Sequence, residues 1–115
     1  MVTLQERLHS TIDAYEAKDF SFLLKGLEGI SENQLQKHYG LYEAYIEKVN
    51  DLLDLQRTVN KYDANHNFSE YREILVELTH NLNAVILHEL YFSNLINKET
   101  SPHLDFKAVI NRDFS

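Results

Sequence analysis

The chain has 115 residues, of which 43% are hydrophobic and 25% charged, with only three glycines and one proline, and this composition predicts one globular, mostly helical domain rather than a disordered or collagen-like chain. Eighteen acidic residues against eleven basic ones give a net charge of −7, so a nucleic-acid backbone is not an expected partner. The absence of cysteine excludes disulfides and thiolate metal sites, whereas six histidines leave imidazole ligands available.

A first amphipathic helix is predicted near the N-terminus, where Leu4, Leu8, Ile12 and Tyr15 recur at helical spacing. The pattern fades between residues 18 and 30, which include two glycines. This N-terminal stretch has no apolar run of the kind found in secretory signals, and nowhere does the chain reach the roughly 18 consecutive apolar residues of a membrane-spanning helix. We therefore expect a cytoplasmic protein with no membrane partner.

A long second helix is predicted from Ser31, whose hydroxyl is placed to accept a hydrogen bond from the backbone N–H of Gln34. After this cap, apolar and aromatic residues alternate at spacings of three and four, a heptad pattern that predicts packing against a partner helix. The positions of the pattern are Leu35, His38, Tyr42, Tyr45, Val49, Leu52, Gln56 and Val59. A polar turn is predicted at residues 63–67.

A third helix is predicted after this turn, with Asn67 or Ser69 as its cap. Its apolar pattern comprises Ile74, Leu78, Asn81, Val85, His88, Phe92 and Leu95. The segment around Pro102 should end this helix and start a short last one, with Ser101 as the cap and Pro102 at the first helical position.

These patterns predict an all-α fold in which residues 1–115 form a single domain: a long antiparallel helical hairpin with a short helix at each end. Two helices of nearly 30 residues would make a hairpin roughly 45 Å long at 1.5 Å per residue. A compact chain of this length has an expected diameter of only about 35 Å. Part of the apolar hairpin surface is therefore expected to contact another chain or another domain.

His38 and His88 each interrupt an apolar pattern, one on each arm of the predicted hairpin. In one interpretation they are ordinary core or interface histidines with satisfied hydrogen bonds. In the other, the antiparallel arms bring the two imidazoles together as ligands of one metal, since neutral imidazole is a common ligand of Fe, Mn and Zn. The spacing of the two histidines in the sequence does not decide between these interpretations. Glu-x-x-His elements at residues 6–9 and 77–80 fit a di-iron bundle, but chance suffices to explain them.

The residues around both histidines resemble the N-terminal domain of iron/manganese superoxide dismutases. Residues 30–40, which contain the element His38-Tyr39-Gly40, are similar to the first helix of that domain. Residues 83–95, around His88, are similar to its second helix, and residues 100–115 to the connector that leads into the family's C-terminal α/β domain. The two histidine elements occur in the family's order, which makes the resemblance specific.

The resemblance implies that His38 and His88 are two ligands of an Fe or Mn ion. In this family the metal alternates between the +2 and +3 states as it oxidises one superoxide to dioxygen and reduces the next to hydrogen peroxide. The other ligands, an Asp and a third His, come from an Asp-x-Trp-Glu-His type motif that the sequence to Ser115 does not contain. We therefore expect the N-terminal half of a dismutase-like protein, with an incomplete metal site that a C-terminal domain completes.

Three positions depart from the family pattern. By this resemblance Tyr45 would correspond to the catalytic gateway tyrosine that controls access to the metal, but it follows His38 by seven residues where the family shows eight. A one-residue helix bulge could restore the aim of its side chain. Tyr42 stands in place of a channel histidine, or is simply a core aromatic residue. Ala84 stands where iron enzymes carry an outer-sphere glutamine.

Two alternatives to the dismutase interpretation stay open. The chain could be a non-catalytic helical module that retains the scaffold and uses its apolar surface to self-associate or to bind another helical protein. Alternatively, two copies could pool four histidines into one metal site between subunits.

Overall fold

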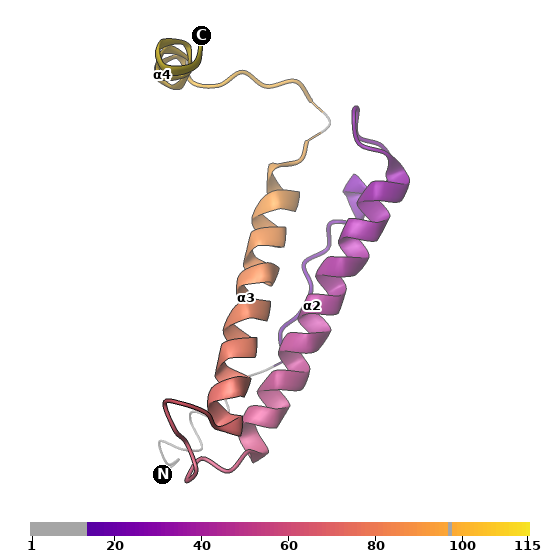
Figure 1. Ribbon diagram of the computed structural model, residues 1–115. Helices are drawn as coiled ribbons and strands as arrows, with labels where there is room; N and C mark the ends of the chain where they lie inside the picture. Colours follow the sequence, from indigo (N-terminus) through magenta and orange to yellow (C-terminus); the bar gives the residue numbers. More distant parts are fainter. Residues whose placement is uncertain (1–13, 97) are drawn as a thin grey trace, which may run out of the picture.

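The structure is a computed structural model that describes residues 14–96 and 98–115. Its elements are the short 3-10 helix η1 (Ser21–Leu23) and the α-helices α2 (Glu32–Thr58), α3 (Glu70–Asn94) and α4 (Leu104–Phe114). Helices α2 and α3 lie side by side as an antiparallel hairpin, and α4 stands apart from it (Figure 1). The predicted all-α hairpin is confirmed. In the described part of the chain, none of the helices has both the length and the apolar character needed to span a membrane.

Serine caps start both long helices. The Ser31 hydroxyl accepts from the backbone N–H of Gln34 at 3.1 Å, and the Ser69 hydroxyl accepts from that of Arg72 at 3.1 Å. Each hydroxyl satisfies one of the N–H groups that a helix start leaves without an intrahelical partner. The predicted cap at Ser31 is confirmed, and Ser69 rather than Asn67 caps the second arm. Helix α2 ends at Thr58, so the predicted polar turn lies within a longer loop, residues 59–69.

The core of the hairpin lies between the facing sides of α2 and α3. The buried residues of α2 are Leu35, Tyr42, Ile46, Val49 and Leu52, and those of α3 are Ile74, Leu78, Asn81, Val85, Glu89 and Phe92. Most of these positions belong to the predicted heptad patterns. Ile46 and Glu89 do not, and His38, Tyr45 and His88 are half-buried rather than buried.

The segment before the hairpin is not helical where the structure describes it. Leu4, Leu8 and Ile12 of the predicted first helix lie outside the described residues, whereas Tyr15 lies in residues 14–20, which are not helical. The Tyr15 N–H donates to Oδ1 of Asn50 at 2.7 Å, and Nδ2 of Asn50 donates to the Tyr15 carbonyl at 3.0 Å. The helix prediction was therefore wrong at Tyr15, because a side chain of α2 satisfies its backbone in place of helical hydrogen bonds.

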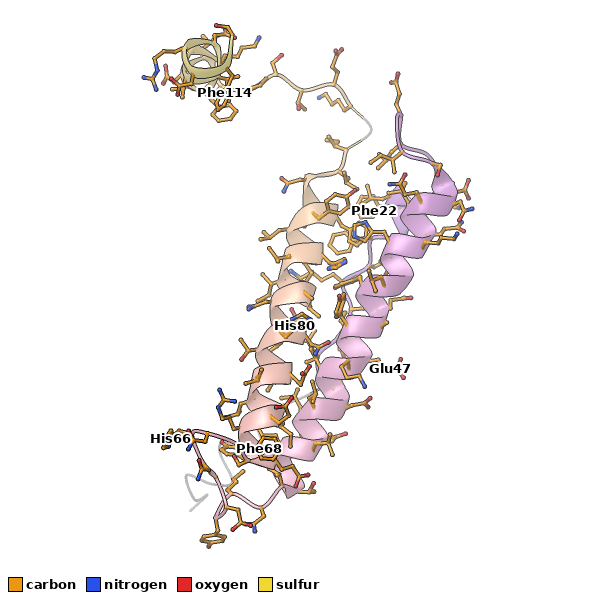
Figure 2. All side chains as sticks on the ribbon, viewed as in Figure 1. Phe22, Glu47, His66, Phe68, His80 and Phe114 are labelled. Carbon is orange, nitrogen blue, oxygen red and sulfur yellow. The ribbon has the colours of Figure 1, made fainter. Side chains whose placement is uncertain are left out.

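The last helix starts two residues later than predicted. Its cap is His103, whose Nδ1 accepts from the backbone N–H of Asp105 at 3.3 Å, so Ser101 is not the cap and Pro102 is not the first helical residue. The imidazole nitrogen of His103 thus accepts from a backbone N–H at the helix start, the role expected of the Ser101 hydroxyl. Helix α4 has no buried residue, and Figure 2 shows its Phe114 far from the hairpin.

The chain is elongated, as the hairpin length predicts. Its radius of gyration is 20.1 Å and its longest dimension is 56 Å, whereas a compact domain of this size has a radius of gyration near 13 Å. Large apolar side chains are exposed on the outer side of α3 and on α4; they include Val76, Ile86, Leu87, Leu90, Leu104, Phe106 and Phe114. The hairpin thus presents apolar surface that the described residues do not cover.

Candidate metal centre

The two histidines of the predicted site face each other across the hairpin. His38 lies near the start of α2 and His88 near the end of α3, so the antiparallel arrangement brings them to the same level. Their ring centroids are 4.8 Å apart, and the ring planes meet at 77°. Both residues are half-buried, which leaves the pair accessible from one side. The juxtaposition expected from the sequence is present, and the ligand role of the two rings stays a prediction.

This spacing suits two ligands of one ion. Imidazole nitrogens bind transition metals at about 2.0–2.1 Å, so two rings in adjacent coordination positions have centroids roughly 4.5–5.5 Å apart. The observed 4.8 Å falls in this range. The separation of the two rings is therefore compatible with two ligands of one ion.

The hydrogen bonding of His88 leaves one nitrogen free to bind metal. Its Nδ1 lies 2.6 Å from the backbone carbonyl oxygen of Ala84, one turn earlier in α3. Because a carbonyl oxygen only accepts, Nδ1 carries the proton, and in the neutral ring Nε2 presents a lone pair. A backbone carbonyl that holds the far nitrogen of a histidine is the usual support for a metal ligand.

The neutral form of His38 is favoured by its surroundings. Burial lowers the pKa of His38 below its usual value, and the nearby His88 lowers it further. Neutral imidazole is the form that binds metal. Burial therefore favours the form of His38 that can bind a cation.

Aromatic rings surround the two imidazoles and restrict their rotation. The His38 ring lies 4.7 Å from the Tyr91 ring and 5.2 Å from the Phe92 ring, between centroids. The His88 ring lies nearly parallel to the ring of Tyr42 from α2, at 6.3 Å between centroids and 19° between planes. Packing of this kind holds side chains in one orientation, which a metal site requires.

Tyr45 lies beside the pair without a helix bulge. Helix α2 is α-helical throughout Glu32–Thr58, so the bulge that would restore the aim of Tyr45 is not present. Two turns separate Tyr45 from His38, and a spacing of seven returns to the same face of a helix. The Tyr45 ring therefore lies 5.4 Å from the His88 ring. Its role as a gateway residue stays a prediction.

Sequence reasoning missed Glu89, which is buried behind the site with 7% of its surface exposed. Its carboxylate accepts from the hydroxyls of Tyr42 at 2.9 Å and Tyr15 at 3.1 Å and pairs with Nζ of Lys18 at 3.2 Å. The sequence does contain a feature that indicates the burial of Glu89. Glu89 is the only Asp, Glu, Lys or Arg in residues 78–97, and it follows a core position by four residues.

The described residues bring together no more than two candidate ligands, His38 and His88. Within 14–96 and 98–115, no cluster of three or more His, Asp or Glu side chains is placed to hold an ion. His66, His80 and His103 are exposed, and Figure 2 shows His80 on α3 and His66 in the loop between the arms. Glu77 is also exposed, which removes the support for a di-iron site at residues 77–80, and residues 6–9 lie outside the described part.

Comparison with known proteins identifies the family. A sequence profile of the iron/manganese superoxide dismutases, alpha-hairpin domain, matches residues 14–96, which include both arms of the hairpin and both histidines. The chain belongs to this family. The match ends before α4, so the expected likeness of residues 100–115 to the connector stays a prediction.

Two curated dismutases are similar to this chain. "Superoxide dismutase [Fe]" of Aquifex aeolicus and that of Aquifex pyrophilus are each 43% identical to the chain over 75 residues, which is 62% of this chain and 35% of theirs. The chain therefore corresponds to about a third of the length of these relatives. No solved structure matches it.

Proposed function

We propose that the chain is the N-terminal half of an iron or manganese superoxide dismutase, in which His38 and His88 supply two of the metal ligands. The Asp and the third His would come from a C-terminal domain, such as the remaining length of the Aquifex enzymes allows. The observation that carries the proposal is the 4.8 Å approach of the two imidazoles from opposite arms of a dismutase-family hairpin.

The bound metal would supply the one-electron oxidation and reduction of superoxide. The chain's own residues would hold and screen it. His88, with its Nδ1 fixed on the Ala84 carbonyl, would direct Nε2 at the ion. Tyr45, whose ring lies beside His88, would govern the approach of superoxide and deliver a proton from its phenol. Phe92 and Tyr91, packed on the His38 ring, would restrict water.

A metal titration tests the ligand assignment. We expect the 115-residue chain to bind Co²⁺, used as a visible-absorbing probe for a divalent ion, and His88→Gln to weaken that binding at least about 10-fold. His80→Gln is the matched control, since His80 is exposed on the same helix, and it should leave binding unchanged. Equal weakening by the two variants would contradict the assignment.

A reconstitution experiment tests the activity. A separately produced C-terminal domain of a related iron superoxide dismutase should form a complex with the chain and, after iron loading, dismutate superoxide. The same complex made with His38→Gln should be inactive. A stable, metal-loaded wild-type complex without activity would defeat the proposed function.

A second candidate, a non-catalytic interaction module, is favoured by the exposed apolar side chains. Ile86, Leu87 and Leu90 are 48%, 65% and 56% exposed on one outer side of α3. Replacing both histidines by Gln separates the candidates. Loss of metal binding with unchanged sedimentation supports the enzyme, whereas loss of self-association in a chain that never binds metal supports the module. A site shared by two copies would show one metal for every two chains.

A further inference from the structure

A buried carboxylate next to the metal centre has no part in the proposed ligand set. Glu89 follows His88 in α3 and points into the hairpin, where it is 7% exposed and is bonded to residues from two other segments. Burying a charge is costly unless it is paired and hydrogen-bonded. A buried carboxylate that needs three partners therefore calls for a functional explanation. The inference drawn from them rests on the proposed function of the His38 and His88 pair.

Glu89 connects to His88 through Tyr42. The Tyr42 hydroxyl donates to Oε1 of Glu89 at 2.9 Å and accepts from the backbone N–H of Lys18 at 3.0 Å. Two hydrogen bonds at one phenol oxygen fix the direction of a ring that is fully buried. That ring lies nearly parallel to the His88 imidazole, at 6.3 Å and 19°. Glu89 therefore helps to fix the aromatic ring that faces His88.

Glu89 also ties the segment before the hairpin to α3. Oε1 accepts from the Tyr15 hydroxyl at 3.1 Å, and Oε2 pairs with Nζ of Lys18 at 3.2 Å. The backbone of this segment is held by α2 as well, since the Tyr39 hydroxyl donates to the Lys18 carbonyl at 3.2 Å. Residues 14–20 thus act as a strap that reaches both arms of the hairpin beside the histidines.

We propose that Glu89 is a positioning residue of the metal centre, which orients His88 through Tyr42 and joins the strap, residues 14–20, to the site. An apolar side chain at this position would pack in the same space but would leave the hydroxyls of Tyr15 and Tyr42 without their acceptor. The strap and the Tyr42 ring would then lose their common anchor. The site would retain both imidazoles, but the orientation of the His88 ring relative to His38 would no longer be fixed.

The test compares two changes of Glu89 with a change at an exposed position. Glu89→Leu removes the acceptor, whereas Glu89→Gln retains an amide oxygen that accepts from Tyr42. Glu77→Leu, on the same helix and exposed, is the control. Two properties are measured on each chain: the cross-relaxation between ring protons of Tyr42 and His88 in the metal-free protein, and the midpoint and visible spectrum of Co²⁺ binding.

We expect Glu89→Leu to remain helical, to lose the Tyr42 to His88 cross-peaks, and to bind Co²⁺ on the order of 10-fold more weakly with an altered spectrum. Glu89→Gln should restore the cross-peaks and most of the affinity, and Glu77→Leu should change neither. A folded Glu89→Leu chain with wild-type cross-peaks and Co²⁺ midpoint would overturn the proposal.

Two further outcomes keep the test decisive. If Glu89→Leu does not fold, Tyr42→Phe takes its place, because it removes only the hydroxyl that Glu89 accepts; unchanged cross-peaks and affinity in that variant would overturn the proposal. If the wild-type chain binds no Co²⁺, the proposed function fails, while loss of the cross-peaks in Glu89→Leu still supports the positioning of His88 by Glu89.

Discussion

Phe92 holds the aromatic cluster around the two histidines together, and its truncation should be the most damaging single change in the hairpin. The side chain is 1% exposed, and its ring lies 5.2–6.3 Å from the rings of both histidines and of four other aromatic residues. Removing a buried phenylalanine costs about 3–5 kcal/mol, from lost transfer free energy and from the cavity left behind. Because a chain of this length has a free energy of unfolding of roughly 6–17 kcal/mol, Phe92→Ala removes a large part of it.

The assay is urea unfolding followed by helical circular dichroism. With a slope of about 1–3 kcal/mol per molar urea, Phe92→Ala should lower the unfolding midpoint by at least about 1 M. Phe114→Ala is the control, since that ring is 81% exposed on α4 and its loss should change the free energy of unfolding by no more than about 0.5 kcal/mol. Equal midpoints for the two variants would refute the assignment of Phe92 to the core.

Three further predictions concern the cap, the turn and the buried phenol. Ser69→Ala should lower the free energy of unfolding by about 1–2 kcal/mol, because the buried hydroxyl caps α3 and also accepts from the Asn65 N–H at 3.1 Å; urea unfolding measures this, and a loss below 0.3 kcal/mol would contradict it. Gly29→Ala should cost about 1–2 kcal/mol in the same assay, because φ is 85° and a side chain is disfavoured there even with open space around it; an unchanged midpoint would argue against this backbone conformation. Burial raises the pKa of Tyr42 to about 12, and the hydrogen bond to Glu89 adds to the rise. The unfolded chain releases this proton near pH 10, so the folded state keeps its full stability below pH 10 and loses on the order of 2 kcal/mol as the pH rises toward 12. The stability difference between wild type and Tyr42→Phe should therefore narrow over that window, and a constant difference would show that the phenol is not buried.

The hairpin could be predicted because its determinants are local. The serine caps act on N–H groups three residues away, and the heptad spacing places one apolar side on each arm whatever the rest of the chain does. Two long helices joined by a polar loop have few ways to bury those sides, so antiparallel packing followed, and with it the approach of His38 and His88. The position of Tyr45 beside His88 follows from the same periodicity, without a helix bulge.

Contacts between segments far apart in the sequence could not be predicted from such local patterns. Periodicity at Tyr15 favoured a helix, but a hydrogen-bonded pairing with Asn50, 35 residues away in sequence, satisfies its backbone instead. The start of α4 moved because a histidine imidazole took the capping role that serine was expected to play.

The sequence alone therefore determined the fold class, the two arms and the histidine on each, since helix periodicity and capping depend on neighbours within a turn or two. Only the tertiary structure decided the surroundings of the site. Glu89 lies 74 residues from Tyr15 and 47 from Tyr42, and a charged side chain is buried only where such distant partners supply its hydrogen bonds. No local pattern encodes that environment, because it exists only once the strap and both arms have come together.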